Sequence, residues 1–329
     1  MTTTRIYKST DTSAPVLVGG VSSLINLLDK CLVTGYGSAT PAGWTKPYTG
    51  TDKAAFRNSV AAGGSGMYLR VVDDGTATGG ARNALCRAYL TMSDVDTGTI
   101  ETPTVAQVAA SIVWRKSNTA DSTPRAWVLI ADERTFWLSI STETNSVDRG
   151  HGLYGAGDIA SFLPGDSYPF FIVGRETQHA AGLNGTHQGI CTPCTALFAS
   201  PVSNGAWIAR GIAGTGNPIR AGIPMPCQSS EFQPIGASSY SIASPAPGVA
   251  LDFWVPALIG SEATIRGQWR GLYAPLTSPG TVTLGHEVVD PPGITGTLTA
   301  LRHYAASNNS NLALYDCHMR VLSDQAWPA

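Results

Sequence analysis

The stretch AWVLIADERTFWLSI, residues 126–140, decides the fold of this chain. Two apolar segments rich in β-branched and aromatic residues flank the polar tripeptide Asp132-Glu133-Arg134, which is the pattern of a β-hairpin. Residues 159–162 and 168–173 continue this pattern after a second turn. Connections here are short, so we expect these segments to extend the same sheet.

Upstream of the hairpin the pattern is also mostly β. Residues 67–72 and 84–90 place Arg70 and Arg87 between apolar neighbours, as two paired, half-exposed strands require. Residues 105–114 fit either a helix or a strand. Both alternatives stay open from the sequence.

One helix is predicted near residues 21–33. Its apolar face would consist of Val21, Leu24, Ile25, Leu28 and Leu32, which follow helical spacing. Ser22 or Ser23 can cap its start, and Gly35 or Gly37 can end it.

After residue 178 the chain becomes rich in Gly, Pro, Ser and Asn, and we predict loops and edge structure there. Strands are predicted at 206–210, 249–258, 264–273, 281–284, 296–304 and 312–321. We therefore expect a mainly-β (α+β) protein with β-sandwich-like sheets and one or two short helices. Two domains are predicted, 1–178 and 179–329.

The composition is low in charge. Charged residues make up 13% of the 329 residues, against about 25% in a usual soluble domain. Such a surface is either solvated by hydroxyls and backbone or covered by neighbouring subunits, whose contact cores are depleted in charge. A net charge of −2 with scattered basic residues argues against nucleic acid as the main partner.

Neither a secretion signal nor a membrane-spanning segment is predicted from the apolar runs. We expect synthesis in a reducing cytoplasm, with free thiols at Cys31, Cys86, Cys191, Cys194, Cys227 and Cys317. Cys191 and Cys194 have the spacing of two ligands of one metal ion (a metal hook) or of a redox pair. A second such pair is missing, so loop thiols are the favoured interpretation and no cofactor is predicted.

Several stretches resemble a family of tailed-bacteriophage virion proteins. The order of short strand, helix and Gly35-Tyr36-Gly37 turn within residues 7–57 is similar to the N-terminus of that family. Further similar patches are residues 92–99, 115–121, 131–135, 158–168 and 271–276, whereas residues 179–260 match least well. The family has no assigned enzymatic activity, so the resemblance implies a virion component rather than a mechanism.

The sequence contains only weak patterns that would indicate a catalytic or ion-binding site. Asp94 and Asp96 lie in a short acidic stretch that lacks the other ligands of an EF-hand, so turns at a strand end are favoured over a calcium loop. A glycan hydrolase would need two facing carboxylates, for which Asp94, Asp96, Asp158, Asp166, Glu231 and Asp252 are available. Carboxylates this sparse fit turns and caps equally well. No nucleophile elbow or phosphate loop is present in the sequence.

One segment has the composition of a protein interface. Arg266, Trp269, Arg270 and Tyr273 lie within eight residues, and Arg, Trp and Tyr dominate binding hot spots. The alternative is that Trp269 and Leu272 are core while the arginines are solvated.

The expected function is that of a non-enzymatic structural subunit of a tailed-phage virion, either associated with the tail or baseplate or decorating the capsid. Its partners would be copies of itself and other virion proteins, within particles assembled in the bacterial host cytoplasm. The alternative is a tail adhesin that binds or degrades a host surface glycan.

Overall fold

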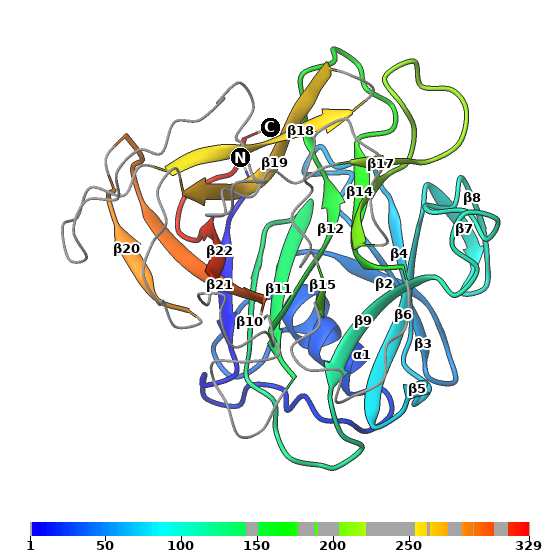
Figure 1. The fold of residues 1–329 in the computed structure, drawn as a ribbon, viewed down its shortest axis with the longest axis vertical. Helices are drawn as coiled ribbons and strands as arrows, with labels where there is room; N and C mark the ends of the chain where they lie inside the picture. Colours follow the sequence, from blue (N-terminus) through cyan, green and yellow to red (C-terminus); the bar gives the residue numbers. More distant parts are fainter. Residues whose placement is uncertain are drawn as a thin grey trace.

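The protein is mainly β, as predicted, with 48% of residues in strands and 5% in helices. Figure 1 shows the fold of the computed structural model, with the strands gathered in a large and a small sheet. The structure describes residues 2–142, 151–176, 188–189, 204–221, 254–261, 264–275, 285–291, 293–305 and 315–328.

The large sheet has 14 strands. Its main path runs β1 (Arg5–Lys8), β10 (Trp127–Ala131), β11 (Thr135–Ser141), β12 (His151–Asp158), β14 (Phe170–Arg175), β9 (Ile112–Ser117), β6 (Ala81–Tyr89), β4 (Tyr68–Val72), β3 (Lys53–Arg57) and β2 (Thr45–Gly50). Four short strands pair off this path: β5 (Ala77–Thr78), β15 (Gln188–Gly189), β16 (Asn204–Ile208) and β17 (Ile219–Ala221).

The small sheet has six strands and packs beside the large one (Figure 1). It consists of β13 (Ala160–Ser161), β18 (Trp254–Ser261), β19 (Thr264–Pro275), β20 (Glu287–Val289), β21 (Thr297–Ala305) and β22 (Tyr315–Leu322). A separate hairpin is formed by β7 (Thr91–Asp94) and β8 (Thr97–Thr99).

The hairpin predicted at residues 126–140 is confirmed as β10 and β11, with Leu129 opposite Leu138. Asp132 shapes its turn, because its Oδ1 accepts hydrogen bonds from the backbone N–H groups of Arg134 (2.9 Å) and Thr135 (2.8 Å). The predicted pairing of residues 67–72 with 84–90 is also confirmed, as β4 and β6. The ambiguous stretch becomes a strand from Ile112 onward.

The central strands are buried on both faces, which explains why they are apolar runs rather than alternating patterns. On β10, Trp127 and Leu129 belong to the core on the side of the helix, whereas Val128 and Ile130 belong to the core between the two sheets. The same alternation places Phe170 and Phe171 of β14 in different cores. The hairpin strands therefore hold the two layers of the molecule together.

The large sheet is curled, and its two ends approach each other. Trp44, next to β2, donates its indole N–H to the Asp132 carbonyl oxygen at 3.0 Å. Asn58, which follows β3, donates its side-chain N–H to the Arg134 carbonyl oxygen at 3.1 Å. These bonds tie the far end of the sheet to the turn between β10 and β11.

The predicted helix is present as α1 (Ser23–Leu28), which continues into the π-helix η1 (Asp29–Thr34). Leu24, Leu28 and Leu32 are buried as expected, but Val21 is half exposed because it precedes the first turn. Gly35 ends the helical segment with a φ of 78°, which favours glycine.

The start of the helix differs from the prediction. Neither Ser22 nor Ser23 caps it with its side chain; Ser22 bonds to Asp52 and Ser23 bonds to backbone oxygens. The Asp73 carboxylate accepts the Leu24 N–H instead, at 2.9 Å. The cap therefore comes from a residue distant in sequence, just after β4.

The sheets do not follow the sequence order that we expected. Residues 170–175 extend the large sheet as predicted, but Ala160 and Ser161 pair with β19 of the small sheet. Conversely, β16 and β17 join the large sheet through β14. The division into domains 1–178 and 179–329 stays a prediction, and strand pairs of both sheets cross that boundary.

Candidate functional site

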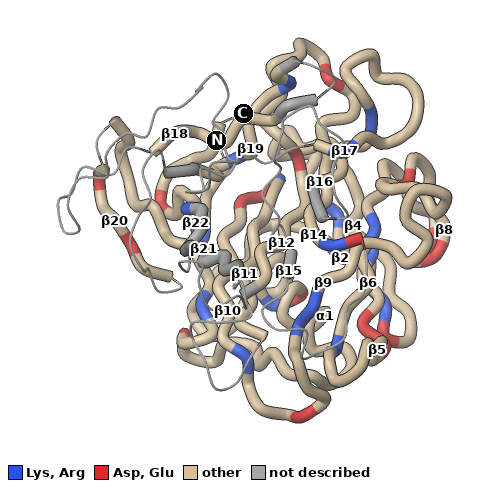
Figure 2. Tube along the Cα trace, viewed as in Figure 1, with Lys and Arg blue, Asp and Glu red and all other residues tan. Residues whose placement is uncertain are grey.

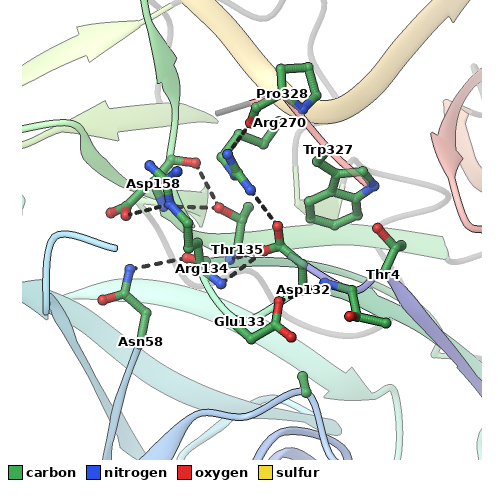
Figure 3. Close-up of polar contacts among 12 residues, drawn as sticks. Thr4, Asn58, Asp132, Glu133, Arg134, Thr135, Asp158, Arg270, Trp327 and Pro328 are labelled. Carbon is green, nitrogen blue, oxygen red and sulfur yellow. Dashed lines mark hydrogen bonds and ion pairs between the residues drawn. The ribbon is translucent and has the colours of Figure 1, made fainter. Parts of the chain in front are cut away.

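A group of charged side chains lies where the two sheets meet. The turn between β10 and β11 contributes Asp132 and Arg134, the end of β12 contributes Asp158, and β19 contributes Arg270 (Figure 3). We call these four residues the inter-sheet junction. Asp132, Asp158 and Arg270 are completely buried.

Arg270 connects the two sheets directly. Its guanidinium donates to Asp132 Oδ2 and to the Pro328 carbonyl oxygen (Figure 3). Nearby, the Trp137 indole N–H of β11 donates to the Arg270 carbonyl oxygen at 2.9 Å. A buried charge pair of this kind is stable only when both partners remain, because one partner alone would be an uncompensated buried charge.

Asp158 connects the junction to the loop before β4. Its carboxylate accepts hydrogen bonds from the Ser65 N–H (2.8 Å) and Ser65 Oγ (2.6 Å), and Arg134 Nε lies 3.5 Å from its Oδ2. These bonds hold the glycine-rich segment 63–66 against β12.

Burial raises the pKa of the Asp158 carboxyl group above its usual range, and the Ser65 hydrogen bonds and the charges of Arg134 and Arg270 act in the opposite direction. In this fold the carboxylates of Asp132 and Asp158 have no exposed surface. The junction therefore binds the two sheets together through groups that are shielded from solvent.

We expect the Asp158→Asn variant to show a flatter dependence of the free energy of unfolding on pH. A raised folded-state pKa means that Asp158 contributes its full stabilisation below about pH 4 and loses it as the pH rises through the folded pKa. Urea unfolding at a series of pH values between about 2 and 8 measures this dependence.

Asp74→Asn is the control for this measurement. Hydrogen bonds from Thr76 lower the pKa of the exposed Asp74, so its stabilisation is present above about pH 4 and is lost as the pH falls. The two variants should therefore change the pH dependence in opposite senses. An unchanged dependence in Asp158→Asn would contradict the assignment.

The other carboxylates considered for catalysis do not converge in the described structure. Asp94 accepts a hydrogen bond from the Val95 N–H, as in a turn. Asp96 forms ion pairs with Lys53 and Arg70, so two cations already occupy the carboxylate of the stretch that resembled a calcium loop. Asp166 pairs with Arg266, and Glu231 and Asp252 lie outside the described residues.

The residues predicted as an interface are placed on β19, and most of them are inside this chain. Arg266, Trp269 and Arg270 are buried, and Tyr273 is partly buried. Trp269 packs edge-on against Phe171 with ring centroids 4.8 Å apart. These contacts join the two sheets, and contact of the four residues with another protein stays a prediction.

One buried ion pair has no signal in the sequence. Lys116 on β9 donates to the Asp73 carboxylate, and both side chains have no exposed surface. Burial lowers the pKa of Lys116 and raises that of Asp73, and the attraction between the two charges opposes both shifts. Since Asp73 also binds the Leu24 N–H, the pair fixes the start of α1 against the sheet.

Cys191 and Cys194, proposed as loop thiols or a metal hook, lie outside the described residues. Cys31 and Cys86 are free and buried. Within the described part of the chain, no three His, Cys, Asp or Glu side chains lie together as metal ligands would. No described helix combines the length and apolar character needed to cross a membrane.

The fold and the junction define a mainly-β protein in which two packed sheets are joined by the buried ion pair of Arg270 and Asp132. Neither the protein-family models nor the curated proteins with which we compared the chain contain a match to it.

Proposed function

We propose that this protein is a non-enzymatic structural subunit of a tailed-bacteriophage virion. It would be associated with the tail or baseplate or decorate the capsid, and it would act through symmetric contacts with copies of itself and with other virion proteins. Assembly would take place in the cytoplasm of the bacterial host.

The observation that supports this proposal is that the chain has few charged residues and that many of these form ion pairs with a buried side chain. Five ion pairs among the described residues include a side chain with no exposed surface: Lys116–Asp73, Arg125–Asp121, Arg134–Asp158, Arg266–Asp166 and Arg270–Asp132. These charged residues therefore stabilise the interior of the protein. Long stretches of the chain carry no charged residue (Figure 2). Protein contact surfaces have the same depletion of charge.

Exposed apolar side chains support the same proposal. Phe162 is 56% exposed and Val289 is 67% exposed. Single exposed apolar residues are ordinary on a monomer, but together with a low-charge surface they suit a chain that packs against neighbours. Repeated in a symmetric particle, weak contacts of this kind add up to stable attachment.

Proteomics of gradient-purified particles tests the proposal. We expect the protein in intact particles, at a copy number that is a multiple of the particle's symmetry, and labelled by specific antibodies on the head or tail. The matched control is a lysate from an assembly-defective phage, in which the protein should not sediment with particles. Its absence from particles would contradict the proposal.

A glycan array with the purified protein tests the alternative adhesin function. Selective binding or cleavage of a host surface glycan would favour the adhesin over a purely structural subunit. Presence in particles without any glycan signal would favour the structural subunit.

A further inference from the structure

The buried pair of Lys116 and Asp73 brings an amine and a carboxyl group into direct contact. Lys116 lies on β9 and Asp73 follows β4, so the pair spans β6, which lies between these two strands in the large sheet (Figure 1). Lys116 Nζ donates to Asp73 Oδ1, and neither side chain has any exposed surface. The carboxyl carbon of Asp73 is therefore one covalent bond from the atom that the amine contacts, in a place shielded from solvent.

Burial favours the uncharged form of both groups. It lowers the pKa of Lys116 and raises the pKa of Asp73. An uncharged amine is a nucleophile, and desolvation is one way in which proteins activate a lysine. Contact between the two groups also removes the entropic cost of a bimolecular encounter. The pair thus has the composition and the placement of two groups that condense to an amide.

The surroundings of the pair fit an amide. The Leu24 N–H donates to Asp73 Oδ2 at 2.9 Å, and the Gly20 carbonyl oxygen accepts from Lys116 Nζ. An amide keeps both bonds, because its carbonyl oxygen is Oδ2 and its single N–H remains on Nζ. Ser23 Oγ loses a contact of 3.3 Å with Nζ but keeps its bonds to backbone oxygens. The uncharged product also avoids the desolvation cost of a buried ion pair.

We propose that Lys116 and Asp73 form an intramolecular isopeptide bond. Nζ first transfers a proton to Oδ1, which converts the ion pair into an amine and a carboxylic acid. The lone pair of Nζ then attacks Cγ to form the Nζ–Cγ bond, a second proton moves from Nζ to Oδ1, and the Cγ–Oδ1 bond breaks. Oδ1 leaves as water with the two protons, so the step needs no oxidant, reductant or further reactant.

This bond joins two strands of the large sheet that do not pair with each other. It closes the stretch of chain from residue 73 to residue 116, which contains β6 and the hairpin of β7 and β8. A cross-link between residues distant in sequence stabilises a fold mainly by restricting the unfolded chain. The isopeptide bond therefore stabilises the sheet within one copy of the chain, whatever that copy contacts.

Mass spectrometry of the protein in denaturant tests the proposal, because denaturation separates an ion pair but not an amide. We expect the main species to be lighter by one water molecule than the mass calculated from its sequence. Cleavage after arginine should give peptides 71–82 and 116–125 joined through Asp73 and Lys116. A chain of full mass that gives these two peptides separately would overturn the proposal.

Lys53 and Asp96 are the matched control within the same digest. They form an ion pair of the same residue types with Nζ 2.7 Å from Oδ2, but their side chains are 34% and 46% exposed. Water solvates the charged forms of such a pair. We expect no cross-link between Lys53 and Asp96. A cross-link at this pair as well would overturn the assignment of the reaction to burial.

The Lys116→Arg variant excludes loss of water elsewhere, for example by ring closure at Asp74 and Gly75. Arginine keeps the positive charge beside Asp73, but its guanidinium stays protonated and does not form the amide. The variant should have its full calculated mass, and a variant that is also lighter by one water would overturn the proposal. If the variant does not fold, the peptide map of the chain without substitutions decides, because it locates the bond. None of these outcomes depends on whether the protein is part of a particle.

Discussion

We expect the Arg270→Met variant to lose about 3–5 kcal/mol of the free energy of unfolding, because it leaves the buried Asp132 carboxylate without its cation. Asp132 and Arg270 both have no exposed surface, so water does not compensate for the loss. The variant also removes the donor to the Pro328 carbonyl oxygen. Chemical denaturation followed by tryptophan fluorescence measures the change.

The double variant Arg270→Met, Asp132→Asn is the control for this prediction. Asparagine keeps the side-chain oxygen that accepts from the N–H groups of Arg134 and Thr135, while it removes the charge. We expect the double variant to be more stable than Arg270→Met alone. A single variant as stable as the unmodified protein would show that the junction does not hold the sheets together.

The second large effect is expected for Trp114→Ala, which should also destabilise the protein by about 3–5 kcal/mol through loss of buried area and formation of a cavity. Trp114 is completely buried, stacks on Tyr154 with ring centroids 5.4 Å apart, and donates its indole N–H to the Val173 carbonyl oxygen at 2.8 Å. Thermal and urea unfolding give the size of the effect.

Two variants calibrate this result. Trp114→Phe retains most of the apolar volume and should cost less than Trp114→Ala. Phe162→Ala removes an aromatic side chain that is 56% exposed and should change stability by no more than about 0.5 kcal/mol. Equal effects of Trp114→Ala and Phe162→Ala would contradict the core assignment.

The local sequence pattern predicted the hairpin and the helix, which depend largely on interactions between residues close in sequence. The hairpin at 126–140 was predicted because a polar turn separates two apolar runs, and the turn residue Asp132 bonds to its own neighbours. The helix was predicted from its apolar spacing, and its end from Gly35 or Gly37, of which Gly35 ends it in the structure. In both cases the predicted feature, the hairpin turn or the helix end, is formed by residues close to each other in sequence.

Contacts between distant residues escaped prediction. Asp73 caps α1 from 49 residues away, and its partner Lys116 is 43 residues distant from it. Nothing in the spacing of these residues links them. The pairing of the short strand β13 with the small sheet was not predicted for the same reason, since its partner on β19 is more than 100 residues further along the chain.

The candidate junction was visible in the sequence only in part. The composition of the segment singles out Arg270 together with Arg266 and Trp269, but it predicts a surface position for Arg270, either in a protein interface or in solvent. Burial depends on which layer covers a strand, and a strand with alternating Arg and apolar residues has the same sequence whether its polar face meets water or a buried carboxylate. The partner Asp132 lies 138 residues away.

By itself, the amino-acid sequence determined that this protein is mainly β, with one helix and a central hairpin, because turn chemistry and side-chain periodicity act over short distances. Only the tertiary structure decided that the two sheets share a core, that the buried ion pair of Arg270 and Asp132 joins them, and that Trp327 packs against Gly271. These features depend on which distant segments meet, and a buried charge is stable only where its partner arrives in space.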